Sequence, residues 1–136
     1  MTLVDFDKKL VLDSSVLIKW IGRKSIASFR LVEEMSRNNY SNEYCLKELR
    51  WFLRDELNLS DDKIGITIDA VRNRVHVLPT PQVKDFQKLV LPDKLKSDLP
   101  IIKTAVDLNA ILVSRDWLLR KEARKYLETA TPEEMM

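Results

Sequence analysis

Two short apolar runs, each followed at once by hydroxyl and acidic residues, constrain the fold of this chain most. The first run, Leu10–Leu12, leads directly into Asp13, and the second, Ala110–Val113, leads into Ser114 and Asp116. Continuous apolar runs of this length are typical of strands that are buried on both faces, as in a parallel sheet. Ligands of such sheets bind at the carboxyl ends of the strands, so we expect both acids to face a functional crevice.

The rest of the chain alternates helical and strand patterns. We predict helices from residue 14 to about 20, 25 to about 37, 46–57, about 61–71, 83–91, 98–109 and 117–125, and further strands over 40–44, 75–78 and 126–130. Residues 40–44 would also fit a loop, and Ile64, Ile66 and Ile68 would also fit a strand. The alternation predicts an α/β fold in which helices cover both faces of a parallel sheet. No repeat or linker divides residues 1–136, which we expect to form a single domain.

Composition excludes several kinds of site. Cys45 is the only cysteine and His76 the only histidine, so neither an internal disulfide, nor a zinc cluster, nor a nucleophilic triad is expected. The net charge of +2 is too small to predict nucleic-acid binding by itself. No stretch has the pattern of a signal peptide or a membrane span, so we expect a reducing, cytoplasmic location and no membrane partner.

A third acid, Asp98, is expected to join the two that follow the strands. It is followed by apolar residues at i+3, i+4 and i+7, so its carboxylate would point along the buried side of a helix. Each of Asp13, Asp98 and Asp116 can also be explained as a helix N-cap, and for Asp98 alone the cap is favoured. However, adjacent parallel strands would bring Asp13 and Asp116 to one sheet edge, beside Asp98. Such crowded charges repel one another unless a cation lies between them.

Glu48 is the fourth candidate, at the edge of the apolar stripe of its predicted helix. As a site residue, Glu48 is favoured by periodicity only slightly over the other glutamates nearby, which are Glu33, Glu34, Glu43 and Glu56. Clustered carboxylates bind hard cations such as Mg²⁺ or Mn²⁺, and phosphodiester hydrolysis fits such a site best. Phosphatases and phosphate-accepting receiver domains also use acid clusters, so the pattern predicts a cation more firmly than a substrate.

Three segments resemble the acidic motifs of PIN-domain ribonucleases, a family that includes the VapC-type toxins. They are LVLDSSVLI around Asp13, CLKEL around Glu48, and DLPIIKTAVDLNAILVSRD from Asp98 to Asp116. The resemblance covers nearly the whole chain. It implies a three-layer α/β/α fold with a central parallel sheet of four to five short strands. It also implies metal-dependent RNA cleavage, with all four acids as the catalytic residues and metal ligands.

The resemblance also suggests roles for neighbouring side chains. Ser15 and Ser114 match positions where the family often has a hydroxyl that orients the site. Basic residues near the site are candidates for RNA contacts, although cations late in a helix also stabilise its dipole; they are Arg115, Arg120 and Lys121. Three tryptophans could stack on bases; they are Trp20, Trp51 and Trp117. Three more basic residues share one face of a predicted helix, and exposure to solvent explains that face better than a contact to RNA does; they are Lys47, Arg50 and Arg54.

The partners that the resemblance implies are an RNA substrate, a second copy of the chain and, for a toxin, a small antitoxin protein. Such an antitoxin would lay an apolar helix or an arginine across the site. The alternative function is a non-catalytic PIN-fold module that binds RNA or supports an assembly. Binding of Mn²⁺ separates these hypotheses, because the non-catalytic module would not need the ion.

Overall fold

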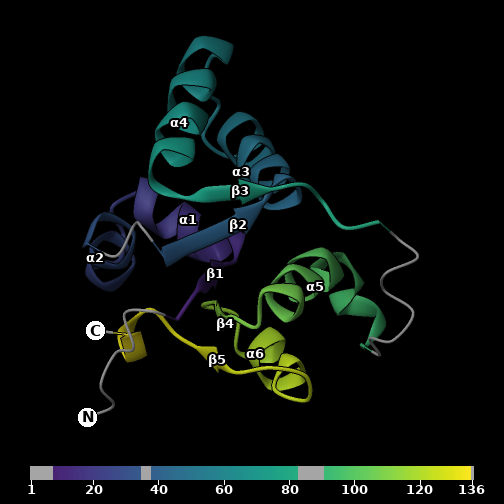
Figure 1. The fold of residues 1–136 in the computed structure, drawn as a ribbon. Coiled ribbons are helices and arrows are strands. Elements are labelled where there is room, and N and C mark those ends of the chain that lie inside the picture. Colours follow the sequence, from purple (N-terminus) through teal and green to yellow (C-terminus); the bar gives the residue numbers. More distant parts are fainter. Residues whose placement is uncertain (1–7, 35–37, 83–90, 136) are drawn as a thin grey trace.

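The computed structural model of the protein describes residues 8–34, 38–82 and 91–135. Its elements follow one another in this order (Figure 1): β1 (Leu10–Leu12), α1 (Ser14–Ile21), α2 (Ile26–Glu34), β2 (Asn39–Asn42), α3 (Glu43–Asp55), α4 (Asp61–Arg74), β3 (His76–Leu78), η3 (Asp93–Asp98), α5 (Leu99–Leu108), β4 (Ile111–Val113), α6 (Trp117–Ala123), β5 (Thr129–Ala130) and η4 (Glu133–Met135).

The strands form one parallel sheet in the order β3-β2-β1-β4-β5. From β1 the chain first builds the sheet through β2 to β3, and later adds β4 and β5 on the opposite side of β1. The strand order therefore reverses between β1 and β4, which is where α/β sheets form their ligand crevice. The predicted parallel sheet is confirmed.

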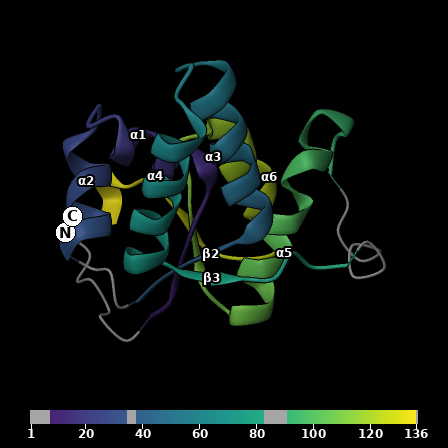
Figure 2. The same ribbon diagram turned by 90° about the horizontal axis from the view of Figure 1, so that it is seen from above.

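Helices cover both faces of this sheet, as predicted. Leu10 and Leu12 of β1 pack in an apolar cluster with residues of α1, α2, α3 and α4. Val11 points to the other face, because side chains alternate along a strand, and packs with residues of α5 and α6. Figure 2 shows the same division, with α1, α2 and α4 on one side and α5 and α6 on the other. The result is the three-layer α/β/α arrangement. No helix within the described residues is long and apolar enough to cross a membrane.

Some element boundaries differ from the prediction. Helix α3 begins at Glu43 instead of residue 46, because the preceding residue, Asn42, caps it. The segment after Ser60 is helical, and the Ser60 hydroxyl accepts the Lys63 N–H at its start. The 3₁₀ helices η3 and η4 were not predicted, since such short helices lack a distinctive apolar period. The helix predicted over 83–91 lies outside the described residues, except for Leu91.

Asn42 connects the two layers of helices. Its side-chain oxygen accepts the Cys45 N–H at 2.9 Å and so caps α3. Its amide group donates to the Pro100 carbonyl at 3.1 Å and to the Thr104 hydroxyl at 2.9 Å, both on α5. The Asn42 side chain is fully buried, so these bonds have no competition from water. It therefore fixes the start of α3 against the start of α5.

Replacing Asn42 is expected to destabilise the fold more than the loss of an ordinary cap. Asn42→Ala should lower the free energy of unfolding by about 2–4 kcal/mol, because it removes a cap and leaves buried polar groups with fewer partners. Ser60→Ala, which removes an exposed cap of α4, is the matched control and should cost about 1 kcal/mol or less. Denaturant titration followed by circular dichroism measures both. Equal losses would show that Asn42 acts only as a cap.

Candidate metal site

Asp13 lies at the carboxyl end of β1, beside the end of β4. Leu12 is paired with Val113, and the Asp13 N–H donates to the Val113 carbonyl at 3.0 Å, which continues the pairing by one residue. Asp13 occupies the N-cap position of α1, but its carboxylate accepts no capping hydrogen bond, and the side chain is only 4% exposed. The capping explanation therefore does not account for this buried acid.

Two serine hydroxyls orient the Asp13 carboxylate. Ser114 donates to Oδ2 at 2.8 Å and Ser15 donates to the same oxygen at 2.9 Å. Each hydroxyl is itself held by a backbone N–H: that of Asp116 donates to Ser114 at 3.0 Å, and that of Arg115 donates to Ser15 at 3.0 Å. The structure thus places both predicted serines against Asp13, where both hydroxyls donate to the same carboxylate oxygen and orient the group.

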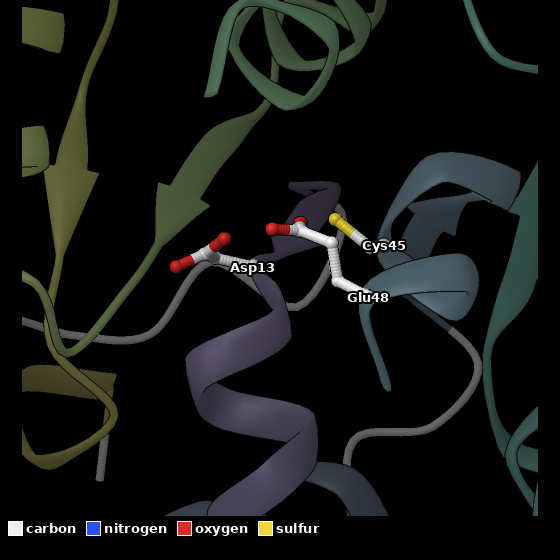
Figure 3. A group of neighbouring side chains, drawn as sticks. All are labelled: Asp13, Cys45 and Glu48. Carbon is white, nitrogen blue, oxygen red and sulfur yellow. The ribbon is translucent and has the colours of Figure 1, made fainter. Parts of the chain in front are cut away.

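Glu48 approaches Asp13 from α3. The carboxylate oxygens of Asp13 and Glu48 and the sulfur of Cys45 lie within 4.8 Å of one another, and Figure 3 shows the Glu48 carboxylate directed toward Asp13. The Ser14 hydroxyl forms a hydrogen bond with Glu48. Three of the competing glutamates are instead paired with arginines: Glu33 with Arg74, Glu34 with Arg30 and Glu43 with Arg72.

Asp98 lies at the end of η3, immediately before α5. Its side chain makes no capping hydrogen bond, so the cap that its position alone favoured is not formed. Burial, followed by the charges of Asp13, Glu48 and Asp116, raises the pKa of Asp98 to about 7. Asp98 is therefore near enough to these acids for their charges to affect it, although the group whose ligand atoms lie within 4.8 Å of one another comprises Asp13, Cys45 and Glu48 and does not include it.

Asp116 does cap a helix. Its Oδ1 accepts the N–H groups of Leu118 at 3.0 Å and Leu119 at 3.2 Å, at the start of α6. Its charge also contributes to raising the pKa values of Asp13 and Asp98, after burial as the main cause. Asp116, which is exposed, therefore caps α6 and also adds negative charge near Asp13 and Asp98. The two backbone N–H groups fix the orientation of its carboxylate.

The donor set of the cluster fits a hard divalent cation. Burial and the charge of Asp13 raise the pKa of Glu48 to about 7, and burial raises that of Asp13 despite its two serine donors. Carboxylates that resist ionisation together would be stabilised by a positive ion between them. Burial raises the pKa of the Cys45 thiol well above its ordinary value, so the sulfur stays protonated and is a poor ligand. The ligands that remain are oxygens, which Mg²⁺ and Mn²⁺ prefer.

The three cations proposed to contact RNA have different surroundings. Arg115 donates to Glu133 at 2.8 Å and to Ser25 at 3.2 Å. Lys121 is exposed, with its ammonium 5.2 Å from the centre of the Trp117 ring.

Arg120 is only 9% exposed, and its contact to RNA stays a prediction. Its Nη1 donates to the Ser114 carbonyl at 2.8 Å, so it supports the loop that carries Ser114 and Asp116.

This fold, with acids gathered where the strand order reverses, is that of the PIN domain family, and the chain belongs to that family: the family model matches residues 10–125. No curated protein matches the chain in sequence.

Three solved structures illustrate the likeness in fold. VapBC2 from Rickettsia felis, bound to a DNA fragment from its promoter, matches with a TM-score of 0.68 and 15% identity, over 90% of this chain and 97% of that one. PAE2754 from Pyrobaculum aerophilum matches with a TM-score of 0.71 and 14% identity, over 94% and 92%. DNA-bound VapBC from Salmonella typhimurium matches with a TM-score of 0.69 and 13% identity, over 92% and 98%.

The raised pKa values predict how stability depends on pH. Between pH 4 and 7 the folded protein holds protons on Glu48 and Asp98 that the unfolded chain has already lost. In the presence of a chelator, the free energy of unfolding should therefore fall as pH rises from 4 to 7, by about 1–2 kcal/mol for each group after solvent screening. Denaturant titrations at several pH values measure this slope.

Asp98→Asn should flatten that slope and stabilise the metal-free protein at pH 8, because the repulsion is reduced. Asp107→Asn, which removes an exposed acid of α5 that is paired with Lys103, is the control and should leave the slope unchanged. A slope that is the same with and without the Asp98→Asn substitution would contradict the description of the cluster.

Proposed function

We propose that the protein is a divalent-metal-dependent endoribonuclease that hydrolyses phosphodiester bonds. The observation that carries this proposal is the close approach of the buried Asp13 and the half-buried Glu48, which come from separate segments. The charges of both also raise the pKa of the half-buried Asp98, and none of the three acids forms an ion pair with a residue that the structure describes. Such a cluster reduces the stability of the protein unless it binds a cation. Membership of the PIN domain family supports the nuclease class.

Asp13, Glu48, Asp98 and Asp116 would hold Mg²⁺ or Mn²⁺. A divalent ion bound there would polarise a phosphoryl oxygen of the substrate and lower the pKa of a bound water. The serines present one fixed Asp13 oxygen to the site, since their hydroxyls occupy the other. A hydrogen bond with Ser14, in the first turn of α1, favours the charged form of Glu48. The chain thus orients its acids before the substrate arrives, which keeps the cost of reorganisation low.

We further propose that the protein acts as the toxin of a toxin–antitoxin pair. The likeness in fold to VapBC2 and to DNA-bound VapBC supports this proposal. A small antitoxin would inhibit the enzyme by laying an apolar helix or an arginine across the acid cluster, because a guanidinium would neutralise the crowded carboxylates. A homodimer in the cytoplasm, acting on RNA, is the form that we expect.

The acid cluster is tested directly by cleavage of RNA. Purified protein should cut single-stranded RNA with Mg²⁺ or Mn²⁺, and Asp13→Asn, Glu48→Gln and Asp98→Asn should each reduce the rate by roughly 100-fold or more, because the ion loses a ligand. Denaturing gels of labelled RNA measure the rate, and circular dichroism checks folding. Glu43→Gln, which changes an acid of α3 that pairs with Arg72, should retain activity.

Two results of this assay would remove the nuclease proposal. One is cleavage that persists in all three folded acid variants. The other is RNA binding without cleavage and without calorimetric Mn²⁺ binding, which would identify the protein as a non-catalytic RNA-binding module.

A Ser114 variant tests whether the orientation of the Asp13 carboxylate affects metal binding when no metal ligand is removed. Ser114→Ala should weaken Mn²⁺ binding by about 10–100-fold, because Asp13 loses a hydroxyl that fixes its carboxylate. Ser41→Ala removes another buried hydroxyl, which donates instead to the Leu12 carbonyl at 2.9 Å, and should leave Mn²⁺ affinity nearly unchanged. Isothermal titration calorimetry measures both variants. Equal weakening would mean that the effect comes from general destabilisation.

A further inference from the structure

A pocket of about 390 Å³ opens beside the acid cluster, between α1 and α3. Its lining combines aromatic, aliphatic and polar side chains: Ser14, Ile18, Tyr44, Glu48, Trp51 and Phe52. Ile18 and Phe52 also pack against the apolar core, so this part of the lining is fixed. The pocket is therefore an extension of the cluster with a partly apolar lining.

The pocket and the acid cluster share residues. Glu48 lines the pocket and also lies within 4.8 Å of the Asp13 carboxylate, measured between ligand atoms. Tyr44 lines the pocket too, and burial, followed by the charges of Glu48 and Asp98, raises the pKa of its phenol. The Tyr44 hydroxyl is protonated at neutral pH, as phenols ordinarily are, and can donate a hydrogen bond. A ligand with one end at the cluster can thus place its neighbouring group in the pocket.

Trp51 is the tryptophan that is suited to binding here. It lines the pocket and its side chain is 60% exposed. Trp20 is instead buried and donates its indole N–H to Glu33. Trp117 is exposed, but its ring is faced by Lys121. Trp51 therefore offers an aromatic surface at the edge of the proposed active site.

Lys47 adds a cation at the same pocket. The other two cations on this side of α3 interact with acids. Arg54 lies 3.8 Å from Asp61. The charge of Arg50 helps to lower the pKa of Glu43, after the hydrogen bond from Arg72. Lys47 forms no ion pair with any residue that the structure describes. An exposed, unpaired ammonium beside an aromatic pocket suits a phosphate next to a base.

We infer that this pocket binds the base of the nucleotide adjacent to the cleaved phosphate, with the base stacked on Trp51 and its phosphate near Lys47. The inference rests on the proposed nuclease function and names its substrate more closely: single-stranded RNA, because bases within a duplex already stack on their neighbours. An apolar side chain of a protein would use the aromatic lining, but neither the cation nor the hydroxyls of Ser14 and Tyr44. A nucleotide uses all of them.

The experiment compares two fluorescein-labelled oligonucleotides that have the same number of phosphates: hexauridylate, and a hexamer with abasic riboses at its four internal positions. Fluorescence anisotropy measures their binding to the full chain with Ca²⁺ in place of Mg²⁺, and gels verify that the RNA stays intact. Trp51→Ala should weaken hexauridylate binding by about tenfold, within the range expected for one stacked base. The same substitution should leave the abasic hexamer unaffected, and Trp51→Phe should largely restore binding.

Ile66→Ala is the matched control, since Ile66 is a 70% exposed apolar residue on α4. Equal weakening by Trp51→Ala and Ile66→Ala, or equal weakening by Trp51→Ala for both oligonucleotides, would overturn the inference. So would a Trp51→Ala variant that binds RNA normally but no longer binds an apolar helical peptide, because the pocket would then serve a protein. Base-dependent binding through Trp51 without any cleavage would retain the pocket and remove the nuclease proposal.

Discussion

The parallel pairing of β1 with β4 determines where the chemistry of this protein can take place. Because Leu12 is paired with Val113, the residues that follow the two strands, Asp13 and Ser114, lie side by side. A shift of the register by one residue would point the acid into the opposite layer. The serine hydroxyl and the carboxylate are thus positioned by the sheet, and the helices bring the other acids to them.

The crowding of these acids opposes folding. Glu48 and Asp98 have pKa values of about 7 because burial and neighbouring charges disfavour their ionised forms. Asn42 stabilises this arrangement, since its buried side chain joins the start of α3, which carries Glu48, to the start of α5, which follows Asp98. We interpret the site as a region of stored electrostatic repulsion that a cation would relieve.

The sequence was sufficient to predict the sheet and its helical layers, because these follow from apolar periodicity and from the alternation of strands with helices. It could not show that Asp13 and Asp98 accept no capping bonds while Asp116 does, since all three occupy similar positions before helices. It also did not identify Asn42, whose preference for the N-cap is local but whose bonds to α5 depend on tertiary packing. Nor could it show the burial of Arg120, because charge is a poor guide to burial when a backbone carbonyl accepts from the guanidinium.

The claim that the cluster is a cation site is tested most directly by carboxyl ¹³C NMR titration of the full chain. In a chelator, the resonances of Glu48 and Asp98 should titrate near pH 7. With saturating Mg²⁺ both groups should be ionised at pH 7 and titrate at lower pH, because the cation favours their charged forms. Resonances that titrate near pH 4 in the chelator, or that do not respond to Mg²⁺, would contradict the account.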